Sequence, residues 1–157
     1  MGFYSPATIV EDARRHGVRI LPVDELRSQR DCTIESDPES SGGFALRIGL
    51  RYVKGISNKD LAALASVPEN LHSIEELVHR TGISKVAVQK LAEAGAFRDL
   101  SLNRRTALWA ALGIRPRKDL IPATGSTLKF APLSAHESTT WDYQSTGVSS
   151  SGHMLRH

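Results

Sequence analysis

The chain has 157 residues, 40% of them hydrophobic and 24% charged, which is enough for one domain with a real core. No run of eighteen apolar residues is present, and the first residues lack the basic and apolar regions of a signal peptide. A single cysteine, Cys32, excludes an internal disulfide framework and fits a reducing compartment. We therefore expect a cytoplasmic protein without a membrane span.

The formal net charge of +3 conceals an uneven distribution of charge along the chain. Residues 1–46 carry five basic and eight acidic groups, whereas residues 47–118 carry thirteen basic and six acidic groups. Residues 119–157 carry two basic and three acidic groups. A locally basic segment is what phosphate binding requires, although a solvated lysine and arginine surface has the same composition.

The first third of the chain predicts one helix and a small sheet. Ser5 and Pro6 are typical of a helix start, and Gly17 is typical of a helix end. Alternating or β-branched residues then predict three short strands, over residues 18–23, 31–35 and 44–48.

From Gly49 onward the apolar residues recur with the period of a helix. A short helical turn is expected at residues 50–53, and four longer helices are expected to begin after capping side chains at Ser57, Ser73, Ser84 and Asn103. After Pro116 no period is sustained, so residues 117–157 are predicted to be an extended or disordered tail. The expected fold is mainly α, with a small β element near the N-terminus.

One tripeptide, Gly-Ile-Ser, occurs twice, at residues 55–57 and 82–84. Each copy is followed by Leu and Ala nine and ten positions after the glycine. Glycine permits a positive φ in the corner, the isoleucine is expected to pack between two helices, and the serine caps the second helix. This is the layout of a helix-hairpin-helix motif, and two copies in tandem form a unit with pseudo-twofold symmetry.

Such a corner has the chemistry of a phosphate site, because a helix N-terminus leaves backbone N–H groups unpaired and adds a partial positive charge. Contacts to the DNA backbone would ignore base sequence. The candidate DNA-binding residues are Lys54, Gly55, Ile56, Ser57, Asn58, Lys59, Thr81, Gly82, Ile83, Ser84, Lys85, Arg104 and Arg105.

A purely structural role for the corners stays open, because most capped helix corners bind nothing. The usual motif also has a second glycine where Ser57 and Ser84 stand here. That difference weakens the close approach of the backbone to a phosphate at one or both corners.

Five stretches of the chain have distinctive sequences: "MGFYSPATIVEDARRHGVRILPVD", "ALRIGLRYVKGIS", "RTGISKVAVQKLAEAGAF", "NRRTALW" and "FAPLSAHESTTWDYQSTG". Together they resemble the bacterial error-prone DNA polymerase of the C family, a relative of the polymerase III alpha subunit. The resemblance runs along nearly the whole chain. It implies a part in DNA-templated nucleotide addition during damage-tolerant, mutagenic synthesis.

The resemblance also implies that the chain is a piece of a longer protein. Residues 1–46 would be the end of the fingers region, 47–116 the tandem helix-hairpin-helix domain, and 117–157 a linker or tail. The catalytic aspartates of the palm, and the Mg²⁺ expected for the full-length parent, would belong to an upstream segment. No catalytic residue, metal ligand or cofactor is therefore expected in this chain.

Two short stretches depart from the family pattern. After Pro22-Val23-Asp24 the family tends to read Val-Asn-x-Ser, where this chain has Glu25-Leu26-Arg27-Ser28, and Met154 stands where relatives tend to have proline. The expected partner is primer–template duplex DNA, with other mutagenic-repair proteins as further candidates. The alternatives are a protein-interaction scaffold or a non-functional remnant that does not touch DNA.

Overall fold

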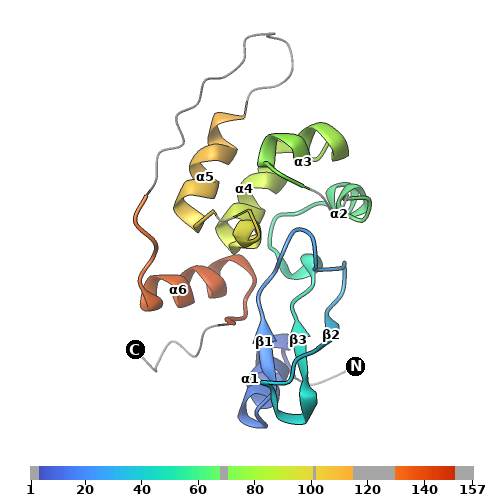
Figure 1. The fold of residues 1–157 in the computed structure, drawn as a ribbon, viewed down its shortest axis with the longest axis vertical. Coiled ribbons are helices and arrows are strands. Elements are labelled where there is room, and N and C mark those ends of the chain that lie inside the picture. Colours follow the sequence, from blue (N-terminus) through green and yellow to red (C-terminus); the bar gives the residue numbers. More distant parts are fainter. Residues whose placement is uncertain (1–3, 68–70, 101, 115–129, 151–157) are drawn as a thin grey trace.

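The fold begins with one helix packed beside a small sheet, in a computed structural model that describes residues 4–67, 71–100, 102–114 and 130–150 (Figure 1). Helix α1 (Pro6–Arg15) starts where the sequence predicts, because the Ser5 side chain accepts a hydrogen bond from the Thr8 amide and proline occupies the first turn. The chain leaves the helix at Gly17, which has a φ of +81°.

The sheet has the order β1-β3-β2, and its strands lie where the sequence predicts them. Strand β1 (Arg19–Leu21) is parallel to β3 (Phe44–Arg47), and β2 (Thr33–Ser36) is antiparallel to β3. A short 3-10 turn, η1 (Ser41–Gly43), leads into β3. The domain boundary expected after residue 46 lies inside β3, so the sheet itself joins the two predicted regions.

The helical region follows β3 through the 3-10 turn η2 (Leu50–Tyr52). Helices α2 (Asn58–Leu64), α3 (Ile74–Thr81), α4 (Lys85–Ala94) and α5 (Arg104–Gly113) all begin after the predicted caps, and the 3-10 turn η3 (Ala96–Arg98) separates α4 from α5. Figure 1 shows these helices at the end of the molecule opposite α1 and the sheet. The expected fold class, mainly α with a small sheet near the N-terminus, is confirmed.

A further helix, α6 (Ala135–Ser145), lies within the segment predicted to be an extended or disordered tail. For residues 135–145 that prediction is wrong. The buried residues of α6 are Thr139, Asp142 and Ser145, so the helix has no apolar stripe by which the sequence could reveal it. Its start is nevertheless marked by a capping box between Ser134 and Glu137. Residues 117–129 and 151–157 of the predicted tail lie outside the described residues.

One hydrophobic core runs through the whole described structure. It includes Val10 of α1 and Ile20 of β1, Leu77 and Leu91 among the helices, and Val148 after α6. The largest fully buried side chain among the described residues is Phe97, between α4 and α5. Because the core is continuous, the sheet and the helices stabilise each other by packing.

Candidate functional site

The first Gly-Ile-Ser corner connects η2 to α2. Gly55 has a φ of +88°, which a residue with a side chain resists, and Ile56 is half-buried beneath the corner. The Ser57 hydroxyl accepts a hydrogen bond from the Asp60 amide and so caps α2, as the sequence predicts. The backbone amides of Gly55, Ile56 and Ser57 find no acceptor among the described residues, so this corner presents open donors.

The second corner connects α3 to α4, and more of its backbone amides are hydrogen-bonded within the protein than at the first corner. Gly82 has a φ of +67°, and its amide donates to the Val78 carbonyl oxygen at 2.8 Å. The Ile83 side chain is only 4% exposed, and its amide faces the Thr81 hydroxyl at 3.4 Å. What remains open at this corner is the first turn of α4, whose earliest amides have no partner within a helix.

Asp60 joins the two corners, a contact that the sequence analysis did not foresee. One of its carboxylate oxygens accepts from the Ser84 amide at 2.8 Å. The other accepts from the hydroxyls of Ser57 at 2.6 Å and Ser84 at 3.1 Å. The capping relation between Ser57 and Asp60 was visible in the sequence, but the 24-residue separation from Ser84 left no local signal.

The charge state of Asp60 follows from these contacts. Its burial by itself raises the pKa, but the hydrogen bonds from Ser57 and Ser84 outweigh burial and hold the pKa below its ordinary value. Asp60 is 8% exposed, so a buried carboxylate lies between two corners that are each expected to bind an anion.

The predicted lysines have different roles in the structure. Lys59 is exposed in the first turn of α2 and has no hydrogen-bond or ion-pair partner among the described residues. The ammonium group of Lys54 donates to the Tyr143 carbonyl oxygen at 3.1 Å, near the end of α6. That of Lys85 donates to the carbonyl oxygens of Leu112 and Ile114, at 2.6 and 3.0 Å, at the end of α5. Lys54 and Lys85 therefore also act as C-terminal caps of neighbouring helices.

Arg104 does not extend a basic face, which corrects the sequence prediction for this residue. Its side chain is buried and forms an ion pair with Asp142 of α6. Its guanidinium also donates to the Ser138 carbonyl oxygen at 3.0 Å. A cation enclosed in this way cannot reach a phosphate. Arg105, the next residue, stays partly exposed and contacts Glu137 at 3.0 Å.

Arg30 adds a cation to the first corner that the sequence analysis missed. It is exposed, and it donates to the Asn58 side-chain oxygen at 3.2 Å, beside the start of α2. Arg30 belongs to the acidic first part of the chain, so its segment gave no reason to place it here. Arg30 lies in the segment between β1 and β2, and only the fold brings this segment beside the start of α2.

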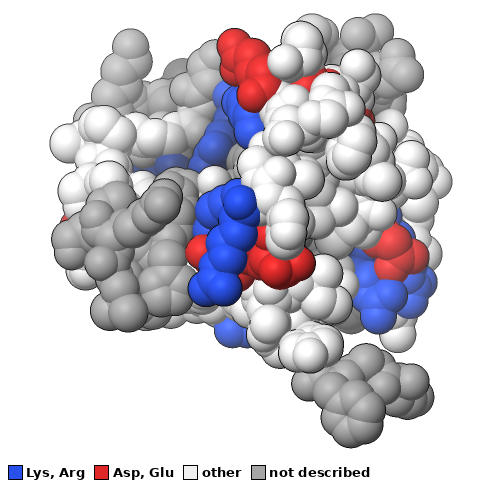
Figure 2. Space-filling model, turned by 90° about the horizontal axis from the view of Figure 1, so that it is seen from below, with Lys and Arg blue, Asp and Glu red and all other residues white. Residues whose placement is uncertain are grey.

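Charges elsewhere on the molecule are largely paired. In Figure 2, which views the molecule from below, basic and acidic side chains lie side by side. On the sheet, Arg19 contacts Asp37 at 3.0 Å and Glu39 at 2.6 Å. Oppositely charged neighbours of this kind cancel much of each other's field at a distance.

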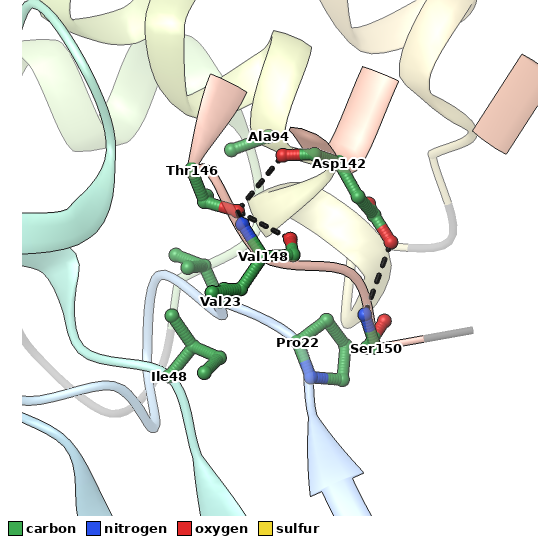
Figure 3. Close-up of a pocket in the computed structure, with 8 residues that line it drawn as sticks. All are labelled: Pro22, Val23, Ile48, Ala94, Asp142, Thr146, Val148 and Ser150. Carbon is green, nitrogen blue, oxygen red and sulfur yellow. Dashed lines mark hydrogen bonds between the residues drawn. The ribbon is translucent and has the colours of Figure 1, made fainter. Parts of the chain in front are cut away.

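A small cavity lies beside the end of α6 and the segment that follows it (Figure 3). Pro22, Ile48, Ala94 and Asp142 are among the residues that line it. Its volume is about 10 Å³, which is room for one water molecule at most. The Asp142 carboxylate is engaged there by the Ser150 amide at 3.1 Å, so the cavity is a packing gap rather than a ligand site.

Two further features bear on the predicted absence of membrane and metal sites. Among the described helices, none is both long and apolar enough to cross a membrane. Within the same residues, no three His, Cys, Asp or Glu side chains gather in a way that could hold a metal ion. The described residues therefore do not fit the Mg²⁺ that the resemblance implies for the full-length parent.

Comparison with known proteins gives one matching family model and several related polymerases. A family model described as a helix-hairpin-helix motif matches residues 17–107, more than half of the chain. The error-prone DNA polymerase of Brucella abortus is 39% identical over 168 residues, which cover 100% of this chain and 15% of that protein. That of Teredinibacter turnerae is 35% identical over 99% of this chain and 16% of its own length.

A third relative, error-prone DNA polymerase 2 of Rhizobium meliloti, is 44% identical over 118 residues. That match covers 73% of this chain and 11% of the relative. The chain thus spans about a sixth or less of the length of these relatives.

Proposed function

The chain belongs to the helix-hairpin-helix family and corresponds to one segment of the error-prone DNA polymerases, and from this premise we propose that it binds primer–template duplex DNA without sequence specificity. In this proposal the chain is the part of a cytoplasmic polymerase that holds the duplex during damage-tolerant synthesis. Nucleotide addition itself is assigned to other segments, because the resemblance places the palm aspartates upstream. Other mutagenic-repair proteins are further candidate partners of the parent enzyme.

The observation that carries the proposal is the meeting of the two Gly-Ile-Ser corners around one side chain, Asp60. Each corner ends in a helix N-terminus, where open amides and the helix dipole favour a phosphate oxygen. The first corner also has two exposed cations, Arg30 and Lys59. Donors of this kind recognise the DNA backbone and carry no information about base sequence.

The test is the salt dependence of binding to duplex DNA of random sequence. Each phosphate contact releases counterions, so the logarithm of the affinity should fall linearly with the logarithm of the salt concentration. Lys59→Gln should reduce that slope by about one unit and weaken binding to every duplex alike. Lys59 is a cleaner choice than Lys54 or Lys85, because those two lysines also hold the ends of α6 and α5.

The matched control is Arg15→Gln, which removes the same charge from the exposed end of α1. This variant should keep the slope of the parent chain, because α1 and α2 lie near opposite ends of the small sheet (Figure 1). An equal loss of slope in both variants would show that only the net charge of the chain affects binding, and not the position of Lys59. A parent chain that binds no duplex at low salt would exclude the proposal and favour the scaffold or remnant alternatives.

A further inference from the structure

Helix α5 presents two large apolar side chains on its outer surface. The Trp109 side chain is 53% exposed, and that of Leu112, three residues later, is 51% exposed. The buried apolar residues of this helix are small ones, Ala107 and Ala111. Residues three apart on a helix are neighbours, so Trp109 and Leu112 form one apolar patch. Apolar patches that are rimmed by polar groups are typical of interaction sites.

The indole of Trp109 is supported by a second ring. The centroids of the Trp109 and Phe130 rings are 5.8 Å apart, and the rings are tilted by 58°. Phe130 is itself attached to the start of α5: its carbonyl oxygen accepts from the Asn103 side chain at 2.8 Å, and its amide faces the Thr106 hydroxyl at 3.4 Å. Tilted aromatic pairs stabilise each other. The contact therefore restricts the indole, while about half of the Trp109 surface stays open to a ligand.

Cations lie at both ends of this patch. Arg105 is partly exposed and stands four residues before Trp109, on the same face of α5. At the other end, the ammonium group of the exposed Lys85 lies 2.6 Å from the Leu112 carbonyl oxygen. Glu137 contacts Arg105 at 3.0 Å, but both side chains are partly exposed. Ion pairs of this kind are weak, so Arg105 can exchange Glu137 for another anion.

We propose that this α5 surface, defined by Lys85, Arg105, Trp109 and Leu112, binds single-stranded DNA, with an unpaired base stacked on Trp109. The inference goes beyond the proposed function and takes from it only that the partner is DNA. An unpaired base has an open apolar face that suits the indole, and the phosphates on either side of the base suit the two cations. A base inside a duplex is already stacked on both faces, so this surface favours single strands.

The experiment uses the full chain and compares Trp109→Leu with Trp109→Phe. Leucine keeps an apolar side chain without an aromatic face, and phenylalanine restores a smaller aromatic face. Affinities are measured for labelled oligothymidine and for a random-sequence duplex of equal length, at several salt concentrations. The matched control is Ile34→Ala, which shortens an exposed apolar side chain of β2, on a different side of the molecule from α5 (Figure 1).

A fluorescence titration reports on the site directly. The chain has two tryptophans, so Trp141→Phe leaves Trp109 as the single emitter. Stacking of a base on the indole should quench the Trp109 emission as oligothymidine is added. Because Trp141 lies outside the α5 surface, this variant should bind oligothymidine as the parent chain does.

We expect Trp109→Leu to weaken oligothymidine binding about tenfold at every salt concentration, because a stacking contact is lost and no charge is removed. Trp109→Phe should lose only part of that affinity. Duplex affinity should change little in either variant, and Ile34→Ala should bind both DNAs as the parent chain does. Arg105→Gln should instead reduce the salt slope for oligothymidine by about one unit.

Three results would overturn the inference. The first is a Trp109→Leu chain that binds oligothymidine as tightly as the parent chain. The second is an equal loss of affinity for both DNAs, because a smaller folded fraction lowers both affinities alike. The third is an absence of Trp109 quenching, which would leave the patch to a protein partner. Binding of oligothymidine through Trp109 without binding of duplex would refute the proposed function and support this inference.

Discussion

Glycines at the corners and helix ends differ in what surrounds them. Gly82 and Gly95 both have a left-handed backbone, with φ of +67° and +74°. A Cβ at Gly82 would meet open space, whereas a Cβ at Gly95 would collide with the Nε atom of Arg104. The same substitution therefore meets backbone strain alone at Gly82, and strain plus a buried ion pair at Gly95.

We predict that Gly82→Ala lowers the free energy of unfolding by about 1–2 kcal/mol, the cost of a left-handed residue with a Cβ. Gly95→Ala should cost more, roughly 3 kcal/mol, because the Arg104 guanidinium must move away from Asp142. The control is Gly113→Ala at the end of α5, where nothing lies within 4 Å of a Cβ and a small gain is expected. Urea unfolding measures all three, and equal costs at Gly82 and Gly95 would contradict the prediction.

Glu25 is a buried carboxyl in the loop after β1. It is 2% exposed, and neither of its side-chain oxygens has a hydrogen-bond partner among the described residues. Burial, with the nearby charges of Asp24 and Asp99, raises the pKa of Glu25 to about 8. Its ordinary value is 4.5, so at neutral pH the carboxyl is protonated in the folded chain and ionised in the unfolded chain.

This difference makes the stability depend on pH. Between about pH 4.5 and 8 the folded state binds one proton more than the unfolded state, so the contribution of Glu25 to stability is lost as the pH rises. We predict that Glu25→Gln is nearly neutral at pH 4.5 and stabilises by on the order of 2–4 kcal/mol at pH 8. Chemical unfolding across this range checks it, with Glu75→Gln as the exposed control. A gain that does not grow with pH would show that the carboxyl is hydrated.

At the scale of elements, α6 is attached to the helical region through polar contacts rather than an apolar face. The buried Arg104–Asp142 ion pair connects α5 to α6, and the Lys54 amide donates to the Ser145 carbonyl oxygen at 2.8 Å. The end of α6 therefore lies against the first corner. Docking by enclosed polar groups depends on every partner being present, because an unpaired buried charge is costly.

We predict that Arg104→Met destabilises the chain by about 3–5 kcal/mol, because it leaves the buried Asp142 carboxylate without its cation. The adjacent Arg105→Met is the matched control: Arg105 also pairs with a carboxylate of α6, Glu137, but both side chains are partly exposed. Exposed pairs contribute little, so this variant should unfold nearly as the parent does. Thermal and urea unfolding compare the two, and similar losses would show that α6 is not attached through Arg104.

At the scale of the whole molecule, the sheet and the helices share one hydrophobic core. In addition, strand β3 crosses the domain boundary that the sequence predicts after residue 46. Removing residues 1–46 would take away β1, β2 and most of β3. The remaining helices would expose core residues such as Ile48 and Leu50, which are 3% and 2% exposed in the intact chain.

We predict that the full chain unfolds in a single cooperative transition, because no part of the core is independent of the rest. Far-ultraviolet circular dichroism and tryptophan fluorescence should give coincident curves, and a chain starting at residue 47 should lack a cooperative transition. An early loss of the sheet with the helices intact would instead support two separate domains.

The sequence by itself determined the parts that depend on near neighbours. Five helix starts follow from caps that span only a few residues. Both Gly-Ile-Ser corners have the positive-φ glycine and the capping serine that their sequence predicts. The family was also accessible from the sequence, because short distinctive stretches survive along the whole chain. Even α6 left one local sign, the capping box of Ser134 and Glu137.

Only the tertiary structure decided which polar groups are paired and which are open. Arg104 and Arg105 are neighbours in the sequence, yet one is buried against Asp142 and the other is partly exposed. Asp60 reaches Ser84, and Arg30 reaches Asn58, across 24 and 28 residues. The sequence shows that a residue is charged but not whether its charge is buried or paired. Whether that charge can reach DNA depends on burial and on partners that are distant in the sequence and that folding brings close.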